Sequence, residues 1–356
     1  MKKPGRKYRV IGAGAAVAIA LTGCGTGEGK NSRDAQNLKI GISVYDQYDT
    51  FVSELVSNFQ EYAKSREKDW GISITLNVEN ANKSQMIQND QMDDFIKDGV
   101  DVVCINLVDR TDASTIIEKA QASDVPVIFF NRELVQEDLE RWDKLYYVGA
   151  DAFESGELQG DILVKSCEKD FNRIDKNGDG VLQYVMLEGE AGHNDSMVRT
   201  MSVINEITGN GYLVEKLSDE IANWNRDQAA NKMKQFLDRF GNRIEVVLAN
   251  NDDMALGAVD ALEAAGYEAG SEKWPMVLGI DGTTVGLNAV KEGKMLGTVL
   301  NDAAGQADGM LELARSITAG TKLPDEYELQ DGKYIRMPYR IVTQDNMGEI
   351  EMLLMK

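Results

Sequence analysis

Polar side chains that could bind a ligand lie in the segments that follow short apolar runs in this sequence. They are Asp49, Asn131, His193, Asp195, Asn251 and Asp281. Carboxylates and amides supply hydrogen-bond acceptors and donors, and Arg199 adds a planar fork of donors. Two large aromatic residues, Phe51 and Trp224, lie near the same run ends. This mixture indicates a neutral sugar, whose hydroxyls donate and accept while its C–H faces rest on aromatic rings.

Each of these residues also has a simpler interpretation when it is taken alone. An Asn or Asp after a strand commonly caps the next helix. Phe51 begins an amphipathic helical pattern, which taken alone favours a core position. Trp224, between Asn223 and Asn225, is harder to place in a core. The polar residues together favour a shared binding site over a series of unrelated caps.

The elements that position these residues form two series. Short β-branched runs alternate with helical patterns, which is typical of parallel sheets built from strand–helix–strand units. The expected fold is therefore α/β, with two doubly wound parallel-sheet lobes. Ligands bind outside the carboxyl ends of the strands in such sheets, so the polar residues converge if the two edges face each other. The predicted strands span 39–45, 72–78, 100–107 and 125–130, and then 182–187, 213–217, 244–249 and 276–280.

Composition excludes several classes of function. The 356 residues include 38 Lys and Arg and 59 Asp and Glu, and the net charge of −21 makes nucleic acid an unfavourable partner. One histidine and three cysteines exclude multi-histidine metal sites and thiolate cages, which leaves calcium or no metal. Cys104 lies in an apolar run and Cys167 on a helical face, so both are expected to be small buried side chains without a function.

The first residues are typical of a targeting segment. Residues 1–9 carry five positive charges and no acid, and the apolar run 10–21 is too short to span a bilayer. The stretch LTGC that follows resembles a bacterial lipobox, which implies cleavage after residue 23 and lipidation of Cys24. Residues 24–37 are then a flexible tether. The predicted location is extracytoplasmic, anchored to the cell membrane by lipid.

A second constellation indicates calcium. Oxygen-bearing side chains occupy positions 1, 3, 5 and 9 of a calcium-binding loop, as Asp175, Asn177, Asp179 and Gln183. Gly180 stands at position 6, where the chain must turn sharply, and Val181 offers a backbone carbonyl at position 7. Position 12 is Met186, which cannot bind the ion, so the loop alone is incomplete. A turn without metal is the alternative.

The chain from residue 38 to 346 resembles the bacterial galactose/glucose-binding proteins, the periplasmic-type sugar-binding subunits of ABC transporters. The motifs are YDQYDTF (45–51), INLVD (105–109), VIFFN (127–131), EGEAGHND (188–195), ANND (249–252) and GTVLND (297–302). The resemblance implies hexose binding, a permease partner and a monomeric protein. It places Phe51 and Trp224 on opposite faces of a pyranose and completes the calcium site with Glu245. The implied hydrogen-bonding residues are Asp49, Asn131, His193, Asp195, Arg199, Asn251, Asp281 and Asn301.

We therefore expect a type I periplasmic binding protein fold that closes on a hexose and is not an enzyme. The first lobe should comprise 38–150 and 298–335, and the second 151–297 and 336–356, with crossings near 149–151, 297–302 and 336–338. Two rivals use the same cleft: a sensory receptor subunit without transport, and a glycosidase using Asp49, Asp195 and Asp281. The targeting segment and the lack of an N-terminal DNA-binding helix pair disfavour a repressor.

Overall fold

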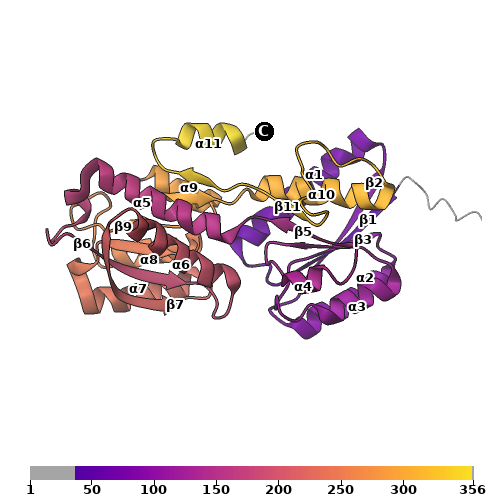
Figure 1. The fold of residues 1–356 in the computed structure, drawn as a ribbon, viewed down its shortest axis with the longest axis horizontal. Helices are drawn as coiled ribbons and strands as arrows, with labels where there is room; N and C mark the ends of the chain where they lie inside the picture. Colours follow the sequence, from indigo (N-terminus) through magenta and orange to yellow (C-terminus); the bar gives the residue numbers. More distant parts are fainter. Residues whose placement is uncertain (1–36, 355–356) are drawn as a thin grey trace, which may run out of the picture. The chain divides into compact units, whose positions relative to one another are not determined.

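A computed structural model of the chain describes residues 37–354 (Figure 1). The predicted signal segment, Cys24 and the tether up to residue 36 lie outside the described residues. The first strand begins at Asn37, the last position of the predicted tether and one position before the predicted start of the first lobe. Within 37–354, no helix combines the length and the apolar character that a membrane crossing requires.

The first lobe is built on a six-stranded sheet in the order β11-β5-β4-β3-β1-β2. Every pairing in it is parallel, as the alternation of strands and helices predicts. Its strands are β1 (Asn37–Val44), β2 (Ser73–Asn80), β3 (Val102–Ile105), β4 (Val127–Phe130), β5 (Leu145–Gly149) and β11 (Tyr334–Arg336).

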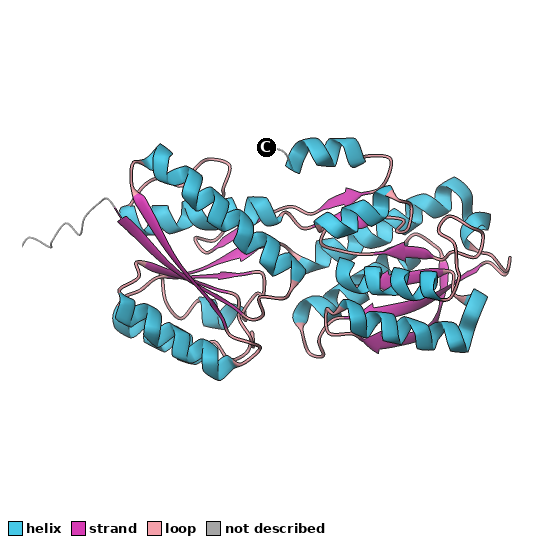
Figure 2. Cartoon of the chain, turned by 180° about the vertical axis from the view of Figure 1, so that it is seen from behind, coloured by secondary structure: helices cyan, strands magenta, loops and turns pink. Residues whose placement is uncertain are grey.

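Helices cover both faces of this sheet, as Figure 2 shows. Helices α1 (Thr50–Trp70) and α10 (Ala303–Ala319) share one apolar core with β1, and α2 (Gln85–Asp98) and α3 (Ser114–Ser123) share another. The short α4 (Gln136–Leu139) precedes β5. Strands β3 and β4 are buried at every position because they lie between two helical layers. Cys104 in β3 is buried with a free thiol, as expected for a small core side chain.

The second lobe contains the sheet β7-β6-β8-β9, and a β10-β12 pair continues from it. Cys167, in the helix over residues 152–174, is buried with a free thiol, as expected. The strands are β6 (Val181–Glu188), β7 (Leu213–Ile221), β8 (Val246–Ala249), β9 (Met276–Leu278), β10 (Thr298–Leu300) and β12 (Arg340–Val342). One core contains α5 (Ala152–Ile174) and α6 (Asn194–Gly209). The other contains α7 (Arg226–Phe240), α8 (Asp252–Ala264), α9 (Thr284–Lys291) and α11 (Met347–Leu354).

Three connections carry the chain between the two sheets, close to the predicted places. They lie between β5 and α5, between β10 and α10, and between β11 and β12. The predicted boundaries are wrong in detail. Residues 298–300, assigned to the first lobe, form β10, which pairs with β12 and, through Leu300, bridges to Asp281 of the second lobe. Arg336, assigned to the second lobe, still pairs with Gly149 in the first sheet.

Candidate ligand-binding site

A pocket lies at the carboxyl ends of both sheets, where the topology of the fold predicts a ligand. The first lobe contributes residues that follow β1 and β4, and the second contributes residues that follow β6, β7, β8 and β9. The lining is therefore assembled from segments far apart in the sequence. It consists of Tyr45, Asp49, Phe51, Asn131, Arg132, His193, Asp195, Arg199, Trp224, Asn251 and Asp281.

Several polar residues of the pocket also cap helices, so the two interpretations of the sequence are compatible. Asp49 caps α1, because its Oδ1 accepts a hydrogen bond from the Val52 N–H at 2.9 Å. Asn251 caps α8 in the same way through the Met254 N–H at 3.0 Å. Such caps fix the side-chain rotamer and leave further polar atoms free for other partners. In Asp49 the second oxygen, Oδ2, accepts from the Tyr45 hydroxyl at 2.6 Å.

His193 is held as a neutral donor. Its Nδ1 accepts a hydrogen bond from the Asp195 N–H at 3.1 Å, which assigns the ring proton to Nε2. Burial lowers the pKa of His193 to about 4, although Asp195 opposes this shift. The imidazole is therefore uncharged near neutral pH and can donate one hydrogen bond from Nε2.

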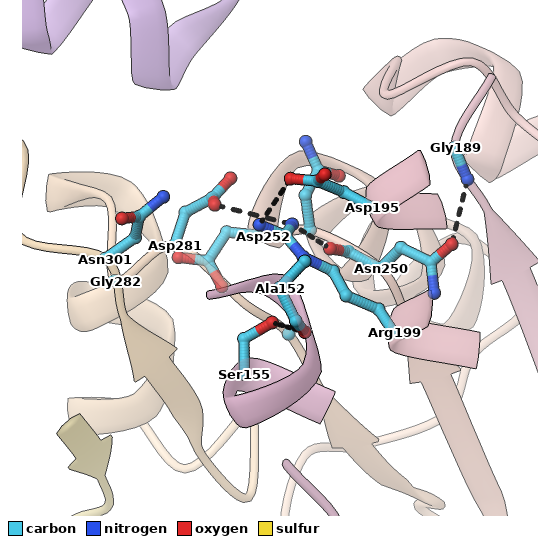
Figure 3. A network of polar contacts seen from close by, with 12 residues as sticks. Ala152, Ser155, Gly189, Asp195, Arg199, Asn250, Asp252, Asp281, Gly282 and Asn301 are labelled. Atoms are coloured by element: carbon cyan, nitrogen blue, oxygen red, sulfur yellow. Dashed lines mark hydrogen bonds and ion pairs between the residues drawn. The ribbon is translucent and has the colours of Figure 1, made fainter. Parts of the chain in front are cut away.

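Arg199 lies between two carboxylates in the second lobe (Figure 3). Its Nη2 is 3.7 Å from Asp195 Oδ2, and its Nη1 is 3.7 Å from Asp281 Oδ1. The guanidinium also donates to the Asn250 carbonyl at 2.7 Å and to the Tyr339 hydroxyl at 3.2 Å. Burial raises the pKa of Asp281 well above its usual range, and Arg199 opposes that rise. These contacts already hold the side chains of the cluster in place, so a ligand would not have to order them.

Asp252 is a buried carboxylate beside this cluster. Its carboxylate accepts from the Thr298 hydroxyl at 2.6 Å and from the Thr283 N–H at 2.8 Å. These bonds join the start of α8 to the cap of α9 and to β10, next to Asp281 (Figure 3). Burial raises the pKa of Asp252 to about 7, and the hydrogen bonds from the threonines oppose the shift. The residue is therefore structural rather than exposed to a ligand.

The two aromatic rings come from different lobes. Phe51, in the first turn of α1, is 5% exposed and belongs to the core of the first lobe. It also lines the pocket, so both interpretations of this residue apply. Trp224 lies between β7 and α7 with a φ of 60°. Its ring covers Gly189, where a Cβ would approach a ring carbon to 2.1 Å. Only glycine at position 189 admits the indole.

Trp224 is less separate from the core than its polar neighbours suggest. Its ring is partly buried against the apolar core of the second lobe. The His193 ring meets it edge-on, with centroids 5.2 Å apart. The indole is thus held by contacts on the second lobe and still lines the pocket.

Asn131 ends β4 in a left-handed conformation, with a φ of 59°. Asn accepts this conformation more readily than most residues. The buried Asn106 donates from Nδ2 to Asn131 Oδ1 at 2.9 Å and so sets the direction of the amide. The Asn131 carbonyl also accepts from the Tyr147 hydroxyl at 3.0 Å.

The pocket brings together every residue predicted to contact a sugar except one. Asn301 lies beside Asp281, with its N–H donating to the Asp281 carbonyl at 2.9 Å (Figure 3). Its Oδ1 accepts from Gln306 at 2.6 Å, and it is absent from the lining. Tyr45 and Arg132 are lining residues that the sequence did not single out. Both stand beside predicted contacts, in the YDQYDTF stretch and directly after Asn131, but only the fold shows their partners.

The predicted calcium loop forms a compact turn that backbone N–H groups stabilise by donating to acidic side chains. Asp175 accepts from the Gly178 N–H at 2.8 Å and, through its other oxygen, from the Gly180 N–H at 2.9 Å. Gly180 has a φ of 81°, as the sharp turn requires. The Glu245 carboxylate accepts from the Lys176 N–H at 2.6 Å and from the Gln183 N–H at 3.0 Å. Glu245, which directly precedes β8, therefore contacts the loop through its side chain.

The donor set of this loop suits a hard cation. Asp175, Asp179, Gln183 and Glu245 supply oxygens, whereas Asn177 turns its amide nitrogen toward Asp179 and Gln183, 3.0 Å and 2.9 Å from their side-chain oxygens. Its own oxygen would reach a cation only after the amide rotates. Side-chain oxygens are the ligands that calcium prefers. The acidic groups alone are not gathered tightly: in residues 37–354 there is no cluster of three or more Asp, Glu, His or Cys side chains arranged to hold a metal. A calcium shell here must include the amide oxygens and a backbone carbonyl.

Two parallel-sheet lobes, three crossings and a polar pocket with aromatic walls define a two-lobed ligand-binding protein of the type I periplasmic fold. The chain belongs to the periplasmic binding protein domain family, whose model matches residues 40–322.

Similar proteins cover almost the whole chain. The D-galactose/methyl-galactoside binding periplasmic protein of Haemophilus influenzae is 36% identical over 318 residues, which are 88% of this chain and 92% of that protein. A putative rhizopine-binding protein of Rhizobium meliloti is 30% identical, over 89% of this chain and 93% of its own. The crystal structure of an ABC transporter solute binding protein from Bacillus halodurans, with bound myo-inositol, is 28% identical, with a TM-score of 0.72 over 90% of this chain and 99% of that one.

Proposed function

We propose that the protein binds a hexose, glucose or galactose, in this pocket. The observation that carries the proposal is the convergence of Phe51 and Trp224 with hydrogen-bonding groups whose directions are already set. The similarity to a D-galactose/methyl-galactoside binding protein and to a structure with bound myo-inositol supports a polyhydroxylated ring as ligand.

The chemistry of the lining suits such a ring. Carboxylate oxygens of Asp49, Asp195 and Asp281 would accept from hydroxyls, and hydrogen bonds to a charged group are the stronger kind. His193 Nε2, Arg199 and the amides of Asn131 and Asn251 would donate. The apolar faces of the ring would pack against Phe51 and Trp224. We infer that Asn301 joins the contacts through a change of its side-chain rotamer, since it lies beside Asp281.

Binding would favour the closed arrangement of the lobes, because ligand contacts from both lobes exist only there. We propose that an ABC permease recognises this closed state and receives the sugar. We also propose that lipid on Cys24 keeps the protein at the outer face of the membrane. A sugar-sensing receptor subunit is the alternative, and identification of the membrane partner distinguishes the two.

We propose in addition that calcium binds the loop 175–183 with Glu245. The ligands would be the side chains of Asp175, Asn177, Asp179, Gln183 and Glu245 and the carbonyl of Val181. A bound ion would hold the loop after α5 against β6 and β8 and so stabilise the second lobe. The loop is not part of the pocket lining, and its role is therefore structural.

The proposal is tested by titrating intrinsic tryptophan fluorescence with glucose, galactose, ribose and arabinose. We expect a saturable change with glucose or galactose, because Trp224 lines the pocket, and weaker binding of the pentoses. The sugar should be recovered unchanged after long incubation, and glycosides should not be cleaved. Turnover of a glycoside would favour the glycosidase alternative, and no response to any of these sugars would contradict the proposal.

A further inference from the structure

Arg132 links the two lobes at the edge of the pocket. Its Nη2 lies 3.0 Å from Glu190 Oε2 of the second lobe, while its Nη1 donates to the Val108 carbonyl of the first lobe at 3.0 Å. The Arg132 side chain is 6% exposed and that of Glu190 is 26% exposed. Within residues 37–354, Glu190 is the only carboxylate that forms an ion pair with Arg132. Separation of the lobes would break this pair.

The same guanidinium is stacked on Tyr45. Its central carbon lies 3.5 Å from the centroid of the Tyr45 ring, closer than the usual limit of about 6 Å for a cation–π contact. The Tyr45 hydroxyl donates to Asp49 Oδ2 at 2.6 Å, and Asp49 lines the pocket. A continuous path of contacts therefore runs from Glu190 through Arg132 and Tyr45 to Asp49.

Other contacts between the lobes involve the start of α1. The Thr50 hydroxyl donates to Asp253 Oδ2 at 2.7 Å, and Glu54 Oε1 accepts from the Thr284 N–H at 3.1 Å. These two contacts differ from the Arg132 pair in one respect. Neither involves a side chain that is linked, as Arg132 is through Tyr45, to the side chain of Asp49. Arg132 alone, among these contacts, joins closure of the lobes to the orientation of a pocket carboxylate.

We propose that Arg132 and Glu190 form a latch that holds the closed state and that, through Tyr45, positions Asp49 for the ligand. Arg132 is thus a positioning residue. The inference about Asp49 rests on the proposed sugar-binding function, whereas the latch itself does not. The latch acts after the lobes meet, so it should slow release of ligand more than it speeds capture.

Three variants separate the parts of the latch. Glu190→Gln removes the charge of the partner and keeps its shape. Arg132→Gln removes both the charge and the planar stack. Arg132→Lys keeps the charge but loses the stack and the forked donors, so it should give an intermediate effect. The matched control is Asp260→Asn, which breaks the ion pair of Arg226 with Asp260 at 2.6 Å within the second lobe.

Stopped-flow kinetics with galactose and small-angle X-ray scattering test the proposal together. We expect Glu190→Gln to raise the dissociation rate about 5- to 50-fold and to leave the association rate within about twofold. The radius of gyration without sugar should rise in Glu190→Gln and Arg132→Gln, and should match that of the unmodified protein at saturating sugar. In the combined variant, the free-energy change calculated from the dissociation rate should be smaller than the sum for the two single variants, because both substitutions break the same ion pair.

The scattering measurement keeps the two proposals separable. If the unmodified protein binds no sugar, the proposed function fails, and the ligand-free radius of gyration still tests the latch. If the protein binds sugar but both Glu190→Gln and Arg132→Gln release it at the unmodified rate with an unchanged radius of gyration, the latch is overturned. An equal effect of Asp260→Asn would also overturn it, because the loss would then not depend on contact between the lobes.

Discussion

Nδ1 of His193 accepts a hydrogen bond from the backbone N–H of Asp195, two residues further along the chain. This single contact caps α6 and determines which ring nitrogen carries the proton. Together with burial, it explains why a histidine can serve as a fixed neutral donor in a pocket that also contains two arginines. His193 thus both caps α6 and lines the pocket.

The first prediction concerns the titration of His193. Burial lowers its pKa to about 4 in the folded protein, against about 6.5 in the unfolded chain. Between these values the unfolded chain binds a proton that the folded protein does not, so stability should fall as the pH falls through this window. The loss should be about 1 to 3 kcal/mol. Because the sequence contains one histidine, its NMR titration is unambiguous and should show no protonation above pH 5.

His193→Asn is the matched variant for this prediction. Asn keeps an acceptor for the cap and does not titrate. Urea unfolding at pH 7 and pH 5 should show a smaller loss for His193→Asn than for the unmodified protein. Equal losses, or an NMR pKa near 6.5, would mean that the imidazole is not buried as described.

The second prediction concerns Trp224. Trp224→Ala should weaken hexose binding by about 2 to 4 kcal/mol, roughly 30- to 1,000-fold, because it removes one wall of the pocket. Part of the ring packs on the core of the second lobe, so unfolding must be measured separately. Calorimetry with glucose and galactose gives the affinity.

Trp70→Ala is the control for the stacking prediction. Trp70 ends α1 and packs against the Arg315 guanidinium, 4.3 Å from the ring centroid, and it does not line the pocket. Its replacement should leave affinity nearly unchanged. If Trp224→Ala binds hexose as tightly as the unmodified protein, the indole does not contact the sugar.

The third prediction concerns calcium. Free calcium at about 100 times its dissociation constant should stabilise the protein by about 2.7 kcal/mol and raise its melting temperature. Glu245→Gln should reduce that rise, because it removes a charged ligand, and should leave hexose affinity unchanged. Glu215→Gln, an acid on β7 of the same lobe, serves as control. Identical melting curves with calcium and after exhaustive chelation would show that the loop is only a turn.

The fourth prediction concerns Cys24. Intact-mass analysis of membrane-extracted protein should give a chain that begins at Cys24 and carries acyl groups, because LTGC follows the short apolar run. Cys24→Ser should abolish the modification and release the protein from the membrane fraction. An unmodified chain that begins at another residue would contradict lipidation.

Much of the fold could be predicted because the signal is local. Runs such as 102–105 and 127–130 are apolar throughout, and parallel strands buried on both faces require this. Strands β5, β10, β11 and β12 are not among the predicted strands. The last three have three residues each, and no longer apolar run marks them as the run 276–280 marks the equally short β9. Their pairing depends on the crossings between lobes, which explains the errors in the predicted boundaries.

The pocket residues could be predicted for a related reason. A polar residue in the segment that follows a strand lies near the carboxyl edge wherever the sheet is parallel, so Asp49, Asn131 and Asp281 needed no tertiary information. Tyr45 and Arg132 could not be found in this way. Their roles depend on contacts with Asp49 and Glu190 that only the folded chain creates, and a buried arginine beside an aromatic ring has no signature in the sequence.

A crystal structure of the protein grown with galactose or glucose tests the central claim most directly. We predict one pyranose between Phe51 and Trp224, with its hydroxyls bonded to Asp49, Asp195 and Asp281 and with the Arg132–Glu190 pair intact. A sugar bound elsewhere on the chain, or a pocket without electron density for a sugar at saturating concentration, would contradict the assignment of the site.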